Sequence, residues 1–171
     1  MSPNANIPPT QTVASSSDPV DHVPVLLNEV IAALLSMESP AAFDQQGSRT
    51  LVDGTFGRGG HSRHLLQRLS ASDRLLAIDR DPDATSAANL IAAKDQRFTF
   101  TQARFSELGK VLAQRGIEHV DGILLDLGVS SPQLDRADRG FSFSADGPLD
   151  MRMNPAEGQS AADWLNTAQE S

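Results

Sequence analysis

The sequence predicts an α/β protein built on a mostly parallel sheet, on the basis of three observations. Between residues 50 and 127, short apolar segments alternate with segments of helical periodicity. The apolar segments are nearly continuous, which is typical of parallel strands covered on both faces. A glycine-rich turn joins the first strand to the helix that follows it. Strands separated by helices in this way form βαβ units, so helices should cover both faces of the sheet.

Composition limits the class of protein. The 171 residues suffice for one domain with a hydrophobic core. The absence of cysteine excludes disulfides and thiolate metal sites and agrees with a cytoplasmic location. No apolar run approaches the roughly 20 residues that span a bilayer, so no membrane partner is expected. The net charge of -8 counts against a nucleic-acid substrate, and the arginines between residues 49 and 80 are most simply interpreted as a solvated helix face.

The first fifty residues lead into this pattern. Residues 1–21 are rich in Pro, Ser, Thr and Asn, and we predict a disordered, dispensable tail. From His22 the chain becomes apolar, and Val30 to Leu35 follow helical spacing. Ser39-Pro40 ends that helix, and residues 40–49 are expected to be a loop.

Four strands and three helices follow in order. The predicted strands are Thr50–Asp53, Arg74–Asp79, Arg97–Phe105 and Asp121–Leu127. The predicted helices are His61–Leu69, Asp83–Ala93 and Ser106–Arg115. Asp81 is expected to cap the second of these helices, because it directly precedes Pro82 at a plausible first helical position.

The pattern breaks after Leu127. Gly128 to Pro155 is a long loop, and loops of this length are usually functional or disordered. Ser160 and Asp163 have the spacing of a capping box at the start of a further helix. We therefore divide the chain into a tail (1–21), a cofactor-binding domain (22–155) and the start of a helical insertion (156–171).

The turn from Asp53 to His61 is the first candidate site. Gly57, Gly59 and Gly60 allow a sharp turn and a close approach of backbone to ligand. In open α/β sheets, such turns at the carboxyl ends of strands bind nucleotide-like cofactors. The alternative is a tight turn without a ligand, which three glycines in four positions make the poorer explanation.

Asp79 ends the second strand, 19 residues after Gly60, where an acid can accept hydrogen bonds from ribose hydroxyls. The alternative is that Asp79 caps a helix or is an ordinary surface acid. Ser62 stands where a dinucleotide fingerprint has its last glycine, and Asp53 would repel a pyrophosphate. S-adenosyl-L-methionine has no phosphate and carries a cationic sulfonium, so electrostatics favour this cofactor.

The segment from Asp126 to Gln133 is the third candidate site. Its Ser130-Ser131-Pro132-Gln133 is loosely similar to the Asn/Asp/Ser-Pro-Pro-aromatic motif of enzymes that methylate exocyclic amines of bases. The second proline and the aromatic residue are missing, and an ordinary Ser-Pro turn explains this motif equally well.

Taken together, several segments resemble one family. They are residues 22–27, 53–62, 77–82, 121–134 and 139–153. In that order they are similar to the signatures of the bacterial 16S ribosomal RNA cytosine-N4 methyltransferases, over roughly residues 22–170. The strings Asp53 to His61 and Arg139 to Met153 are the most specific of these matches.

The resemblance implies a Rossmann-like methyltransferase that moves a methyl group from S-adenosylmethionine to the N4 amine of a cytidine. The implied partner is 16S rRNA in the decoding region of the small ribosomal subunit. The implied cofactor contacts are Gly59, Gly60, His61, Asp79, Phe105, Asp126 and Gln133. Position alone leaves Phe105 open between stacking on adenine and core packing. Chains of the family are longer and their sheets have more strands, so we expect an incomplete enzyme here.

The long loop is expected to serve the target base, which must be unstacked to enter a pocket. Phe141, Phe143, Met151 and Met153 would line that pocket or form a small core under the loop. Arg136, Arg139 and Arg152 would meet phosphates. We name no catalytic residue and no metal ligand.

Two alternatives to this function are another amino-methyltransferase, acting on DNA or a small molecule, and a non-catalytic nucleotide-binding module.

Overall fold

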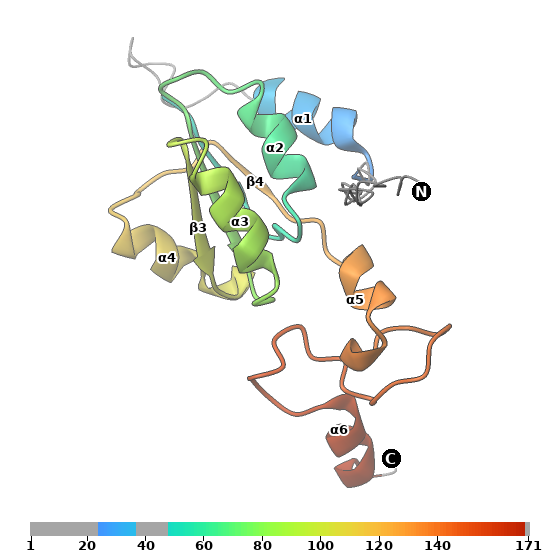
Figure 1. The fold of residues 1–171 in the computed structure, drawn as a ribbon. Helices are drawn as coiled ribbons and strands as arrows, with labels where there is room; N and C mark the ends of the chain where they lie inside the picture. The colour runs from blue at the N-terminus through green and yellow to red at the C-terminus, as the bar shows by residue number, and fades with distance from the viewer. Residues whose placement is uncertain (1–23, 37–47, 170–171) are drawn as a thin grey trace, which may run out of the picture.

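The computed structural model describes residues 24–36 and 48–169, and it contains a four-stranded parallel sheet in the order β3-β2-β1-β4 (Figure 1). The strands are β1 (Thr50–Asp53), β2 (Arg74–Asp79), β3 (Phe98–Gln102) and β4 (Gly122–Leu124). All three pairings are parallel, which confirms the α/β prediction. The predicted tail at residues 1–21 and most of the predicted loop at 40–49 lie outside the described residues.

Six α-helices and two 3-10 helices connect and follow these strands in the described part of the chain. The α-helices are α1 (Leu27–Ser36), α2 (Gly60–Leu66), α3 (Ala84–Ala92), α4 (Leu108–Gln114), α5 (Ser131–Asp135) and α6 (Ala161–Thr167). The 3-10 helices are η2 (Phe105–Glu107) and η3 (Ala137–Arg139).

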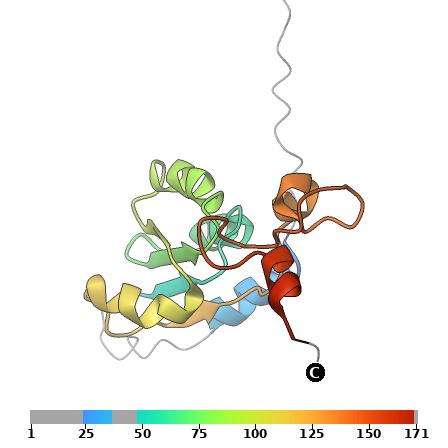
Figure 2. The same cartoon turned by 90° about the horizontal axis from the view of Figure 1, so that it is seen from below.

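Alternate residues along the strands pack into two separate cores. Leu51, Leu75 and Ala77 face the helices α1, α2 and α3 and form the larger core. Val52, Leu76, Ile78 and Val111 form the smaller core, which α4 covers. Figure 2 shows α3 and α4 on opposite sides of the sheet. This two-sided burial explains why the strands are continuously apolar in sequence.

Two strands are shorter than predicted because their neighbours end first. The predicted strand 97–105 ends at Gln102, where β2 has reached Asp79, and Phe105 begins η2 instead. The predicted strand 121–127 ends at Leu124, whose carbonyl accepts the Gly54 N–H (2.8 Å) as β1 turns away. Single backbone hydrogen bonds continue just beyond the strand ends: the Ala103 N–H donates to the Asp79 carbonyl (2.9 Å), and the Asp121 N–H donates to the Thr50 carbonyl (2.8 Å).

The expected helix cap at Asp81 was wrong in position. Helix α3 begins at Ala84 with Asp83 at its N-cap. The Asp81 carboxylate accepts the Asp83 N–H (2.9 Å) in the turn before the helix, and it has further partners that are described below.

The segment after β4 contains no strand within its described residues, as predicted, and it lies at the carboxyl end of the sheet (Figure 1). One of its contacts with the sheet domain is made by Glu157, whose carboxylate lies 3.0 Å from Arg104 Nη2. The predicted capping box is present: Ser160 Oγ accepts the Asp163 N–H (3.1 Å), and α6 follows.

Two structural features are absent from the described residues. No helix in this part of the chain is long and apolar enough to cross a membrane. Within the same residues, no group of three or more histidine or acidic side chains is arranged to hold a metal ion.

Candidate functional site

The glycine turn after β1 presents one open position at the carboxyl edge of the sheet. Gly57 has a φ of 55°, and a Cβ placed on it would meet no atom within 4 Å. Its N–H donates to Asp79 Oδ2 at 2.6 Å. The turn is therefore held against the end of β2 while its outer side stays accessible to a ligand.

The other two glycines of the turn allow close packing. A Cβ on Gly59, which has a φ of 76°, would lie 2.6 Å from the Phe56 ring. A Cβ on Gly60 would lie 2.5 Å from Pro24 Cγ. A ligand that contacts Gly59 or Gly60 must therefore contact their backbone atoms, on the side away from Phe56 and Pro24.

Asp79 is half-buried at the end of β2 and already accepts two backbone N–H groups. Besides Gly57, the N–H of Asp81 donates to its Oδ1 at 2.9 Å. Burial raises the pKa of the Asp79 carboxyl, and these hydrogen bonds oppose the shift only in part. A carboxylate has about four lone-pair sites, so Asp79 retains acceptor capacity for hydroxyl groups of a ligand.

Asp53 lies beneath the same turn and is buried with 1% of its surface exposed. Its carboxylate accepts the Ser62 hydroxyl at 2.7 Å and the Thr55 N–H at 3.2 Å. Burial raises the pKa of this carboxyl despite both hydrogen bonds. Asp53 thus joins the turn to the first turn of α2.

His61 and Asp126 meet beside the turn. His61 is buried, with Nε2 3.2 Å from the Val25 carbonyl oxygen and Nδ1 4.0 Å from Asp126 Oδ2. Asp126 is exposed, and its N–H donates to the Thr55 hydroxyl at 2.7 Å. The ends of β1 and β4 are thereby connected, and Thr55 is a contact that sequence reasoning missed.

Phe105 is half exposed at the start of η2, so it does not pack into either core. Its Cβ would lie 3.7 Å from a Cβ placed on Gly54, at the beginning of the glycine turn. Core packing, one of the two interpretations that its position in the sequence left open, is therefore excluded. The other interpretation, stacking on the adenine of a ligand, stays a prediction.

Gln133 lies farther along, in α5, and its side chain is fully engaged within the protein. Its Oε1 accepts the Ser130 N–H (2.9 Å), while Nε2 donates to Asp81 Oδ2 (2.7 Å) and contacts Met153 Sδ (3.1 Å). Ser130 and Gln133 form a capping box at the start of α5. The Ser-Ser-Pro-Gln segment thus has a local structural role.

The expectation that three loop arginines are available to phosphates needs correction. Arg139 is buried and paired with Asp81 and Asp83. Arg136 pairs with Asp83 and Asp138, and Arg152 pairs with Asp150. Each guanidinium is therefore already partnered within the chain, and that of Arg139 is closed off from solvent.

The loop's apolar residues do not share one environment. Phe141 is buried, whereas Phe143 is fully exposed and Met151 is half exposed. Met153 is partly buried against Gln133. They form neither a single pocket lining nor a single small core.

Three carboxylates surround the turn, and His61 beside Asp126 is the one basic side chain within ion-pair distance of them among the described residues. Among the residues that the structure describes, no lysine or arginine lies within ion-pair distance of Asp53, Asp79 or Asp126. Such a site disfavours a phosphate-rich ligand and favours a cationic one. Of the predicted contacts, Gly59, Gly60, His61, Asp79, Phe105 and Asp126 lie around the carboxyl edge, and Gln133 reaches it through Asp81.

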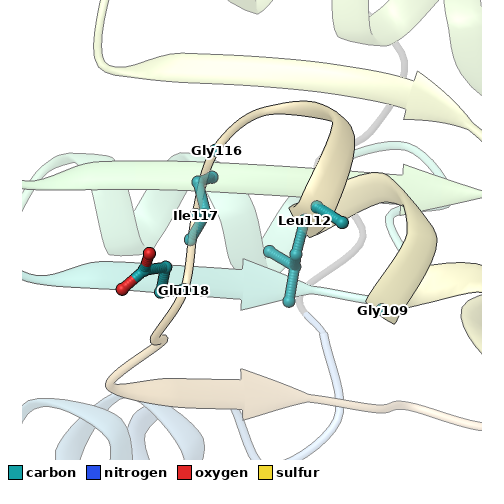
Figure 3. A pocket seen from close by; sticks show the side chains of 6 residues that line it. Gly109, Leu112, Gly116, Ile117 and Glu118 are labelled. Atoms are coloured by element: carbon teal, nitrogen blue, oxygen red, sulfur yellow. The ribbon is translucent and has the colours of Figure 1, made fainter.

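A shallow pocket elsewhere is not part of this site. Figure 3 shows it beside α4, with Gly109 and Leu112 on the helix and Glu118 on the loop that enters β4. None of the predicted cofactor contacts lines it, and Glu118 is the one charged residue in its lining.

Comparison with known proteins gives a consistent result. The model of the MraW methylase family matches residues 19–171. A protein named ribosomal RNA small subunit methyltransferase H from Methylibium petroleiphilum is 54% identical over 154 residues. Proteins of the same name from Thiobacillus denitrificans and Nitrosococcus oceani are 58% and 53% identical. The alignments cover 87–89% of this chain but 44–46% of these relatives, so the chain spans less than half of their length.

Proposed function

The chain belongs to the MraW methylase family, and on that premise we propose that the protein transfers a methyl group from S-adenosylmethionine to RNA. The proposed target is the N4 amine of a cytidine in 16S rRNA of the small ribosomal subunit. The observation that carries the proposal is the open Gly57 turn held by Asp79 at the carboxyl edge of a Rossmann-like sheet.

The residues at this edge fit the proposed cofactor. Asp79 keeps acceptor capacity for the ribose hydroxyls, and half-exposed Phe105 offers a face for adenine. Asp126 is exposed beside the turn, where a carboxylate suits a cationic amino or sulfonium group. The acidic surroundings and the open side of Gly57 together favour this ligand over a dinucleotide.

When bound, S-adenosylmethionine supplies an activated methyl group on sulfur. The chain's own contribution is to bind the donor in one orientation and to bring the amine in line with the methyl–sulfur bond. The cytosine amine is delocalised into its ring, so positioning matters more than a strong base if its proton leaves late. We assign no catalytic residue.

We further propose that residues 22–155 form the cofactor-binding domain and that residues 156–171 begin a helical insertion. Support comes from α6, whose Trp164 and Leu165 are 60% and 57% exposed. Large apolar side chains left in solvent in this way suit a helix that packs against a further element.

The test uses the full-length protein with labelled S-adenosylmethionine and three substrates: small ribosomal subunits, free 16S rRNA and DNA. We expect label in the RNA of the subunits, and nuclease digestion with mass spectrometry should identify N4-methylcytidine. Label in DNA would support another amino-methyltransferase. Tight cofactor binding without transfer to any substrate would support a non-catalytic module.

A further inference from the structure

A buried ion pair joins the loop after β4 to the turn that follows Asp79. Arg139 and Asp81 have side-chain exposures of 5% and 8%, and Arg139 Nη2 lies 2.9 Å from Asp81 Oδ2. Arg139 Nη1 donates to Asp81 Oδ1 at 3.3 Å and to Asp83 Oδ2 at 2.7 Å. The two residues are separated by 58 positions in the chain.

Asp81 has no capacity left for a ligand. Its Oδ2 accepts from Arg139 and from Gln133 Nε2, and its Oδ1 accepts from Arg139 and from the Asp83 N–H. Burial would raise the pKa of this carboxyl, but hydrogen bonds from Arg139 and Gln133 outweigh it and lower the pKa below its ordinary value. Asp81 is therefore a charged acceptor used for connection within the protein.

Arg139 extends the connection to the far end of the loop. Its Nη2 donates to the carbonyls of Met153 (2.9 Å) and Arg152 (3.3 Å), and its own carbonyl accepts the Met151 N–H (3.1 Å). Met151 has a φ of 59°, a left-handed conformation that costs a non-glycine residue energy and persists only where neighbours enforce it. The Arg139 guanidinium thus contacts both the turn after β2 and the carbonyls of residues 152 and 153, while the Arg139 backbone holds Met151.

The turn after β2 connects the Arg139–Asp81 ion pair to the proposed cofactor site. The Asp81 N–H donates to Asp79 Oδ1, and Asp79 Oδ2 accepts the Gly57 N–H. Arg139, Asp81, Asp79 and Gly57 therefore form a continuous series of contacts from the loop to the open glycine turn. A buried ion pair is weak evidence for stability, because the cost of desolvating both charges offsets their attraction.

We propose that Arg139 and Asp81 are positioning residues, which hold the loop after β4 in a fixed relation to the ribose-binding carboxylate of Asp79. This inference rests on the proposed function, since it takes Asp79 as a cofactor contact. Neither residue touches the cofactor or the target base; both act through Asp79 and through the loop backbone at 151–153.

The test compares Arg139→Lys, Arg139→Met, Asp81→Asn and the double variant Asp81→Asn/Arg139→Met in the full-length protein. Arg139→Lys keeps the positive charge but removes the bidentate contact of the guanidinium with Asp81. The double variant leaves no unpaired buried charge, so its stability should recover relative to Arg139→Met alone. The matched control is Arg136→Met, which removes a half-exposed arginine paired with Asp83 and Asp138 but not with Asp81.

Binding is measured by calorimetry with S-adenosylhomocysteine, and turnover with small ribosomal subunits. We expect Arg139→Lys and the double variant to lower cofactor affinity about threefold or more and kcat about tenfold or more, because small misplacements of reacting groups are costly. The KM for the subunits should change less than the kcat. Arg136→Met should leave both cofactor affinity and kcat near the wild-type values.

Two results would overturn the inference. One is wild-type affinity and kcat in Arg139→Lys. The other is a double variant that regains full kcat once its stability is restored, because the pair would then serve stability alone. If the wild-type protein binds cofactor but methylates no RNA, the proposed function fails, whereas the calorimetric comparison still decides the inference.

Discussion

The Asp79 carboxylate combines a half-buried position with two backbone hydrogen bonds and remaining acceptor capacity. We expect Asp79→Ala to weaken S-adenosylmethionine binding by about 1–3 kcal/mol, the cost of losing charge-assisted hydrogen bonds. Isothermal calorimetry on the full-length protein measures this directly. Asp135→Ala, which removes an exposed acid from α5, is the control and should have no effect. Unchanged affinity in Asp79→Ala would remove this residue from the site.

The raised pKa of Asp79 also predicts a pH dependence. Because burial raises this pKa, the carboxyl takes up its proton at a higher pH than an ordinary aspartate. Protonation removes acceptor capacity, so cofactor affinity should fall as the pH is lowered toward and through the raised pKa. The sign for folding is opposite, since a raised carboxyl pKa favours the folded state at lower pH.

Affinity measured by calorimetry across a pH series tests this dependence, with Asp79→Asn as the comparison. The amide does not titrate, so the variant should bind more weakly at neutral pH and lose less affinity on acidification. An identical pH profile in the two proteins would contradict the assignment of the titration to Asp79.

At the scale of elements, the capping box at Ser160 sets the start of α6. Ser160 Oγ accepts the Asp163 N–H, and Asp163 Oδ2 lies 3.2 Å from the Ser160 N–H. Ser160→Ala should destabilise this helix by about 1 kcal/mol. Because α6 buries little, the loss should appear as faster hydrogen exchange of its amides rather than as a lower unfolding temperature. Asn166→Gln, an exposed change near the end of the helix, should leave exchange at the first turn unaltered.

The elements differ in how far local sequence determines them. β1 and β2 match the prediction at both ends, because apolar residues buried on both faces mark a central strand. The ends of β3 and β4 depend instead on where β2 and β1 stop, which no local pattern contains. Capping at Ser160 was predictable for the same reason as β1: both partners lie within one turn of chain.

The candidate site likewise contains some features that local sequence predicts and others that depend on residues far apart in the chain. The glycine turn and Asp79 stand in a local strand–turn–helix pattern and were identifiable. The connection from Asp81 to Arg139 was not, because its partners are 58 residues apart and their pairing depends on how the loop folds back. Asp81 was misassigned as a helix cap because its position before Pro82 was the only local signal it carried.

At the scale of the whole molecule, the sheet has an open edge at β4. Among the strands that the structure describes, β4 pairs with β1 alone, and Ile123 and Leu125 are 46% and 45% exposed. Within the described residues, α4 is the one helix that packs on the smaller core, and it does not cover these two side chains. Unpaired backbone beside exposed apolar residues favours edge-to-edge association.

We therefore expect residues 1–171 to be marginally stable and to self-associate through this edge. Ile123→Lys should reduce association, because a charge on an edge strand opposes pairing with another chain while the lysine stem still covers apolar surface. Leu90→Lys is the control, since Leu90 is 64% exposed on α3, away from the edge. Sedimentation velocity at several concentrations measures the association, and equilibrium denaturation measures the stability. A chain that stays monodisperse at all concentrations and unfolds cooperatively would contradict the expectation that the exposed β4 edge promotes association.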